Sequence, residues 1–196
     1  MRTEETQALL SLLWMLLSDP RMLVLFALLL IASVSDWRSY RIPNWLTFGG
    51  ALFALLSGVL MARTPGAGAM QALSGLALGF VLLLPCYALG VMGAGDVKLM
   101  AMVGAFLGAG ATLQAVALSL IAGGVAAIAF ALYHRKLARM LGNVKTAVQG
   151  MAVAGMAGVA PTASLDQSQS VGKLPYALCI SAGTLIQVLA AQLGYA

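Results

Sequence analysis

The chain consists of long apolar runs separated by short polar segments. The apolar runs cover residues 22–34, which extends back to Pro20, and 45–61, 70–91, 97–133 and 174–193. A helix needs about 20 mostly apolar residues to cross a bilayer. The run over 97–133 is too long for one helix, and its Gly- and Ala-rich residues 108–112 divide it into two. The pattern therefore predicts an all-α integral membrane protein with a bundle of about six transmembrane helices.

Two other segments fit this pattern less well. A short apolar run over 7–17 ends at Ser18-Asp19-Pro20, so we interpret residues 1–20 as an interfacial segment or as a kinked extension of the first span. Residues 147–160 are only mildly apolar, and we expect a cytoplasmic loop over 146–172 with an interfacial or re-entrant part. If residues 147–160 were a span, the last helix would be reversed. We expect one membrane-embedded domain over residues 1–196.

Composition supports the membrane class. Hydrophobic residues make up 61% of the chain and charged residues 9%, whereas a soluble domain carries about 25% charged residues. The net charge of +5 could suggest nucleic acid as a partner. In a membrane protein, an excess of Lys and Arg reports orientation instead. We therefore expect the lipid bilayer as a partner and no nucleic acid.

The basic residues predict an orientation. With the N-terminus outside, three basic residues lie outside: Arg2, Arg21 and Arg63. The other eight lie inside: Arg38, Arg41, Lys98, Arg135, Lys136, Arg139, Lys145 and Lys173. This bias agrees with the positive-inside rule. It places Asp36 and Asp96 on the same, cytoplasmic side, with two spans between them.

Asp36 and Asp96 are the candidate catalytic residues. They are the acidic residues that lie where an apolar helix meets a short loop. An ionisable group at such a place is a functional candidate, although a boundary residue paired with Arg38, Arg41 or Lys98 is the structural alternative. Two such residues on one face favour function.

The sequences that flank these aspartates predict how each is held. Residues 36–44 are expected to form a short extended loop, because Pro43 restricts the residue before it and suits the first turn of the next helix. Gly93 and Gly95 precede Asp96 and allow a close approach of a substrate backbone. Asp96 is expected to open the helix from residue 97, where the helix dipole favours a carboxylate.

These motifs resemble the type IV prepilin peptidases, which belong to the GxGD intramembrane aspartic proteases. The resemblance covers residues 20–194 and rests on three segments, which are Asp36 with Ile42-Pro43-Asn44, Gly93-Ala94-Gly95-Asp96-Val97-Lys98, and Leu174-Pro175-Tyr176. It implies that Asp36 and Asp96 form a catalytic pair, and that Pro43, Asn44, Gly93, Gly95 and Lys98 shape the site. The implied substrates are prepilins and pseudopilins, cut at the cytoplasmic face of a bacterial inner membrane between a basic leader and an apolar helix.

The chain departs from the larger, bifunctional members of that family. Those members carry a cytoplasmic insert with paired cysteines and also methylate the new N-terminus. This chain lacks that insert, so it resembles the short, peptidase-only branch of the TadV or CpaA type, which serves Flp/Tad pili. Cys86 and Cys179 lie in apolar runs without CxxC spacing and read as small buried thiols.

The expected chemistry needs no metal and no cofactor. One aspartate takes a proton from water while the other protonates the scissile carbonyl, and two neighbouring carboxylates suit these roles because they do not both ionise easily. Lys98 is expected either to orient Asp96 or to extend to the membrane surface. The only histidine, His134, has no acidic neighbour, so no Ser-His-Asp set competes.

Three alternative functions remain open from the sequence. The aspartates could serve a transporter or channel, but the spans carry almost no polar residues at mid-helix. The chain could be a structural component of a pilus or secretion assembly, for which helix packing through small residues would suffice. It could also be a GxGD protease that cuts within a membrane helix, for which we would expect the first aspartate at mid-span. The sequence leaves the oligomeric state open.

Overall fold

The computed structural model describes residues 19–133, 142 and 175–194. The predicted loop over 146–172, and residues 1–18 of the predicted interfacial segment 1–20, lie outside them. The described residues form six helices, as predicted. They are α2 (Pro20–Ser39), α3 (Asn44–Met61), α4 (Pro65–Ala88), α5 (Ala94–Leu107), α6 (Ala109–Tyr133) and α8 (Tyr176–Gln192). The all-α fold is therefore confirmed.

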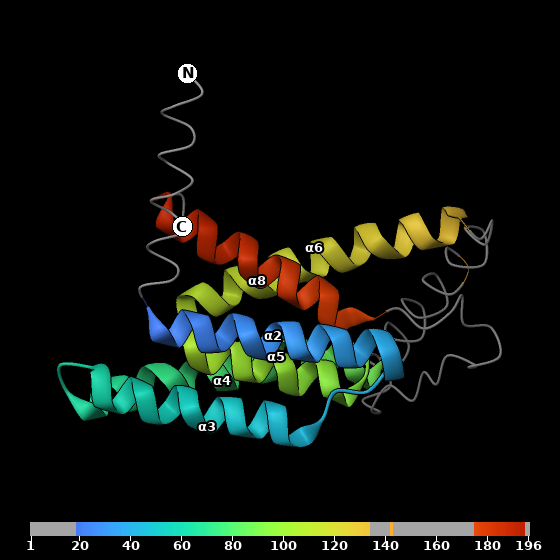
Figure 1. Ribbon diagram of the computed structural model, residues 1–196. Helices are drawn as coiled ribbons and strands as arrows, with labels where there is room; N and C mark the ends of the chain where they lie inside the picture. Colours follow the sequence, from blue (N-terminus) through green and yellow to red (C-terminus); the bar gives the residue numbers. More distant parts are fainter. Residues whose placement is uncertain (1–18, 134–141, 143–174, 195–196) are drawn as a thin grey trace, which may run out of the picture.

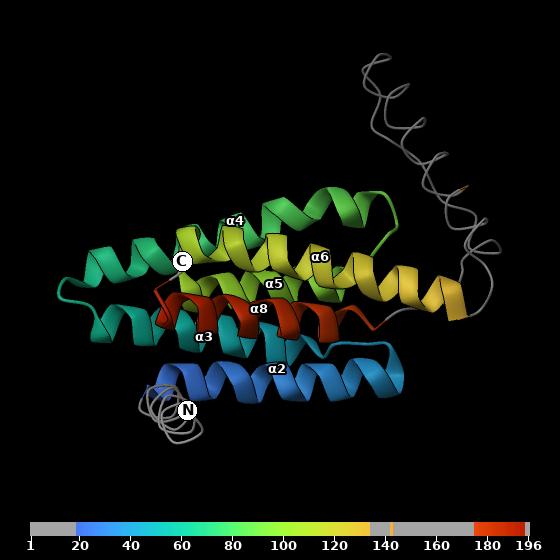
Figure 2. The same ribbon diagram turned by 90° about the horizontal axis from the view of Figure 1, so that it is seen from above.

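The helices form a bundle with two distinct ends (Figures 1 and 2). At one end α2, α4 and α6 finish and α3, α5 and α8 begin. Asp36 and Asp96 both lie there, so we call it the aspartate end. At the opposite end α2, α4 and α6 begin and α3, α5 and α8 finish. The two aspartates thus share one end of the bundle, as the count of spans between them predicts.

Four helices are long and apolar enough to cross a membrane, namely α2, α3, α4 and α6. Large apolar side chains point outward from them, including Leu30, Leu60 and Ile121. Such surfaces are normal where lipid is the solvent. The other two helices are shorter, with 14 residues in α5 and 17 in α8. At 1.5 Å per residue α5 extends over about 21 Å, less than the roughly 30 Å apolar core of a bilayer.

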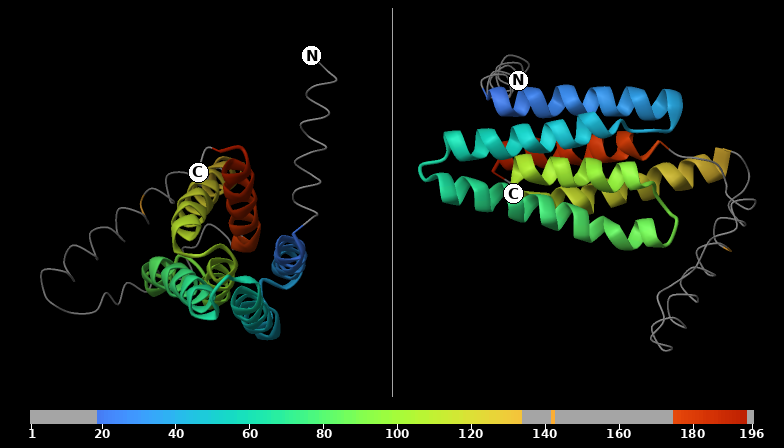
Figure 3. Two further views of the ribbon diagram at one scale, coloured as in Figure 1. Left: turned by 90° about the vertical axis from the view of Figure 1, so that its left-hand side faces the viewer. Right: turned by 90° about the horizontal axis from the view of Figure 1, so that it is seen from below.

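α5 is the central helix of the bundle (Figure 3). Ten of its 14 residues are buried, and it contacts each of the other five helices. After Lys98 its residues are apolar or small on every side, which is the pattern of a helix without a solvent face. The position of Asp96, in the first turn of α5, is therefore fixed from all directions.

Glycines bring α4 and α5 into backbone contact. Gly75 of α4 lies against the carbonyl of Gly104 in α5, and a Cβ on either glycine would collide with the other's carbonyl oxygen. One turn further along α4, a Cβ on Gly79 would meet the carbonyl oxygen of Met100 at 2.5 Å. Gly75 and Gly79 thus form a GxxxG pair that lets the two helix backbones approach closely. Gly108 then turns the chain from α5 into α6 with a φ of +79°, which glycine adopts without strain.

Three helix boundaries differ from the predictions. α2 continues through Asp36 to Ser39, so residues 36–39 are helical and the loop is limited to 40–43. Tyr40 ends this helix in the left-handed conformation, with its N–H bonded to the Asp36 carbonyl. α4 starts at Pro65 instead of residue 70, because proline suits the first helical position. α5 starts at Ala94, two residues before Asp96, instead of at residue 97.

The Gly75 contact yields a test of the packing. We expect Gly75→Ala to lower the free energy of unfolding by about 1–3 kcal/mol, because the added methyl group has to separate the two helix backbones. Gly49→Ala, in the middle of α3 with open space around it, is the matched control. It should be neutral or stabilising by up to about 1 kcal/mol. Thermal unfolding in detergent measures both, and equal effects would contradict the close packing.

Candidate active site

Asp36 lies in the last turn of α2 with its side chain 7% exposed. Its Oδ2 accepts a hydrogen bond of 3.0 Å from the backbone N–H of Ala177, in the first turn of α8. The first N–H groups of a helix have no partner within that helix and carry its positive dipole end. A carboxylate from another helix therefore satisfies one of these donors and is stabilised by the dipole.

The contact between α2 and α8 has a definite register. The Ser33 and Ser181 hydroxyl oxygens lie 2.9 Å apart, and these residues are one helical turn away from Asp36 and Ala177, respectively. Because α2 and α8 run in opposite directions, the serine pair and the Asp36–Ala177 bond form two successive rungs between the same helix faces. The serine pair thus helps to hold the Ala177 amide opposite Asp36.

Asp96 is buried at 8% exposure in the first turn of α5. Its Oδ2 accepts a 3.0 Å hydrogen bond from the N–H of Gly93, the residue that caps the helix. This is the return half of a capping box, in which a carboxylate at the third helical position reaches back to the cap. Gly95 packs on the loop before α3, where a Cβ would lie 3.3 Å from Ile42. The small residues around Asp96 therefore let two motif segments meet.

The two carboxylates lie at the same end of the bundle, and the charge of Asp36 reaches Asp96 as a minor influence beside burial. Each carboxylate uses Oδ2 for a helix N–H, and Oδ1 of each makes no hydrogen bond within the described part of the chain. Two carboxylates that repel one another favour a state with a single negative charge. The arrangement can supply one proton acceptor and one proton donor to a molecule between them.

Lys98 does not pair with either aspartate. Its Nζ donates a 3.0 Å hydrogen bond to Oδ1 of Asn44 and lies 5.5 Å from the centre of the Phe48 ring. The contact joins the start of α5 to the start of α3, next to the packing of Gly95 on Ile42. Pro43 caps α3 in an extended conformation. Pro43, Asn44, Gly95 and Lys98 therefore lie together at the aspartate end, where they connect the start of α3 to the start of α5.

The N-terminal turn of α8 is a part of this site that residue-by-residue reasoning did not assign. Tyr176 lies within reach of the charge of Asp96, and its ring packs against Gly123 of α6. The donor to Asp36 is a backbone N–H, which has no sequence signal of its own. In the sequence, only the Leu174-Pro175-Tyr176 segment indicated that this region belongs to the site. Cys179 is a buried free thiol and Cys86 a half-buried one.

Arg41 belongs to the loop that follows α2. Arg41 contributes its carbonyl, which accepts a 2.8 Å hydrogen bond from the Ser35 hydroxyl, to the turn after α2. His134 lies outside the described residues. Among the residues that the structure describes, no three of His, Cys, Asp and Glu group in a way that could hold a metal ion.

Comparison with known proteins identifies the family. A model of the type IV leader peptidase family matches residues 23–128, which contain both aspartates and the helices α3, α4 and α5. No curated protein and no solved structure matches the chain. The family match covers more than half of the 196 residues, and the chain therefore belongs to the type IV leader peptidase family.

Proposed function

We propose that this protein is an aspartic endopeptidase that removes the leader peptide of type IV prepilins and pseudopilins, with Asp36 and Asp96 as its catalytic pair. The observation that carries the proposal is the position of both carboxylates at one end of the bundle, each held through one oxygen by a helix N-terminus. Family membership supports a prepilin-type peptidase and argues against a transporter or an assembly component.

The reaction follows from a pair that carries one proton. The ionised aspartate takes a proton from a water molecule as the water oxygen bonds to the scissile carbonyl carbon. The protonated aspartate gives its proton to the carbonyl oxygen, which yields a neutral tetrahedral intermediate. The intermediate then collapses: the aspartate that gave its proton takes one back from a hydroxyl group of the intermediate, the C–N bond breaks, and the proton taken from water passes to the leaving nitrogen. The products are a new carboxyl group on the leader and a free amine on the mature pilin.

The site suits a substrate that is half in water and half in lipid. Three aromatic residues near the turn between α2 and α3 are more than half exposed, namely Trp37, Tyr40 and Trp45. Exposed Trp and Tyr are typical of the membrane–water interface. We infer that the carboxylates lie at this level, where a soluble leader and an apolar helix of one substrate can both be accommodated.

We propose that the protein lies in the inner membrane of a bacterium, with the aspartate end facing the cytoplasm. Arg38, Arg41 and Lys98 lie at the aspartate end, whereas Arg21 and Arg63 lie at the opposite end. Of the six other basic residues, five come in the sequence between the end of α6 and the start of α8, which are both at the aspartate end, and Arg2 precedes α2, which starts at the opposite end. This distribution supports the cytoplasmic assignment.

The aspartate pair is tested by substitution. We expect Asp36→Asn and Asp96→Asn each to lower the cleavage rate by about 10²-fold or more, since each removes an acid–base group. The assay is cleavage of a co-reconstituted prepilin followed by gel shift. Asp19→Asn is the matched control, because asparagine caps a helix as well as aspartate does and Asp19 lies at the opposite end. A wild-type cleavage rate for either Asp36→Asn or Asp96→Asn would contradict the two-aspartate mechanism.

The Lys98–Asn44 contact should act on geometry alone. We expect Lys98→Met to slow cleavage by less than about tenfold, because an exposed polar contact is worth about 1 kcal/mol at most. Asn44→Ala and the double variant should lose no more than Lys98→Met does, which a double-mutant cycle of cleavage rates measures. Additive losses would show that the two residues act separately, and a loss as large as that of Asp96→Asn would give Lys98 a direct role.

We further propose that cleavage occurs without methylation, in line with the resemblance to the peptidase-only branch. The mature substrate released by the purified enzyme should carry an unmodified α-amino group even when S-adenosylmethionine is supplied. Mass spectrometry of the new N-terminal peptide measures this. An N-methylated peptide formed by the purified chain would show that it has both activities.

A further inference from the structure

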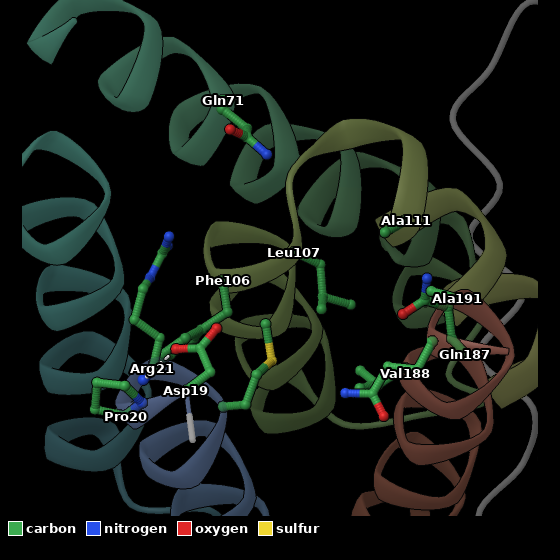
Figure 4. Close-up of a pocket in the computed structure, with 12 residues that line it drawn as sticks. Asp19, Pro20, Arg21, Gln71, Phe106, Leu107, Ala111, Gln187, Val188 and Ala191 are labelled. Carbon is green, nitrogen blue, oxygen red and sulfur yellow. Dashed lines mark hydrogen bonds between the residues drawn. The ribbon is translucent and has the colours of Figure 1, made fainter. Parts of the chain in front are cut away.

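A cavity of about 730 Å³ opens at the end of the bundle opposite the aspartates. It exists because the central helix is short: α5 ends at Leu107, and its last residues form one wall between the start of α2 and the end of α8. Figure 4 shows side chains of α2, α4, α5, α6 and α8 around this space. Polar groups line it together with apolar ones, among them Arg21, Leu107, Gln187, Val188 and Gln192.

The polar groups of this cavity are unusually short of partners. Within the described part of the chain, four buried side-chain polar atoms lack a hydrogen bond, and three of them belong to cavity residues: Arg21 Nε, Gln187 Oε1 and Gln192 Oε1. Gln187 is only 2% exposed. Most buried polar atoms in proteins are paired, and those that are not call for a ligand, an ion or water. Their concentration around one space points to a molecule that binds there.

Arg21 gives this cavity a positive charge. Its guanidinium makes one long hydrogen bond, 3.5 Å from Nη2 to the Ala54 carbonyl. The neighbouring Asp19 accepts from the backbone N–H of Arg21 through Oδ1, and no carboxylate of the described residues forms an ion pair with the guanidinium. A charged group among apolar helices is costly unless an opposite charge meets it. The guanidinium is therefore suited to an anion, and its planar donors match the oxygens of a phosphate.

The glutamines specify the rest of the ligand. Their free Oε1 atoms accept hydrogen bonds, so the molecule should carry hydroxyl or ammonium donors beside its anionic group. Leu107 and Val188 add apolar wall, and the helices around the cavity have lipid-facing sides. We propose that this cavity binds a phosphate ester whose head group carries hydrogen-bond donors, as in phosphatidylglycerol of the surrounding bilayer. This binding is independent of peptide cleavage at the aspartate end.

The test measures binding of phosphatidylglycerol to the full chain in detergent by native mass spectrometry. We expect Arg21→Gln to weaken binding by about tenfold or more, because it removes a charge-assisted contact to phosphate. Arg21→Lys should retain binding to within a few-fold. Arg63→Gln is the matched control, since it removes an exposed cation at the same end but outside the cavity. Thermal unfolding and prepilin cleavage verify that each variant is folded.

Two further arms complete the design. Gln192→Leu keeps the side-chain volume near the end of α8 and removes an acceptor, and we expect a several-fold loss of binding even if Arg21→Gln fails to fold. Competition by soluble glycerol 3-phosphate at millimolar concentration would assign the same chemistry to a soluble phosphate ester, and its failure to compete would assign it to lipid. Unchanged binding by Arg21→Gln or by Gln192→Leu would overturn the proposal. An equal loss with Arg63→Gln would do so too, because it would mean general charge attraction.

Discussion

The structure depends on one buried helix that every other helix touches. α5 has no free side, and it can lie this deep because Gly75 and Gly104 let α4 approach it backbone to backbone. A residue with any side chain at either position would push the two helices apart. Since Asp96 lies in the first turn of α5, the same packing that stabilises the bundle also fixes one half of the proposed active site. The position of this carboxylate is therefore a property of the whole core.

The other half of the site is fixed differently. Asp36 is on α2, at the edge of the bundle, and its carboxylate is tied to the N-terminus of α8. Both carboxylates thus use a helix N-terminus as a partner, one within its own helix and one from another helix. A helix N-terminus stabilises a negative charge without adding a cation. This matters for an acid–base pair, because a neighbouring Lys or Arg would hold both carboxylates ionised.

The sequence predicted the helices, the shared end of Asp36 and Asp96, and the short α5, because these follow from apolar run length and from counting spans. It misplaced the end of α2, since a left-handed Tyr40 at a helix end carries no glycine signal. It also could not assign a partner to Lys98, because packing decides whether this long side chain reaches Asp96 or Asn44. The Ala177 amide and the cavity near Arg21 were beyond its reach, as both are made by residues distant in sequence.

The bond between Asp36 and Ala177 joins residues separated by 141 positions, and this has a consequence for synthesis of the chain. During translation both aspartates enter the membrane long before α8 is made. Until then Asp36 lacks the amide that holds it and α2 lacks its serine contact with α8. The nascent chain therefore contains the two acidic residues without their final arrangement. The last helix completes the proposed site, so on this proposal the chain gains peptidase activity only when the bundle is complete.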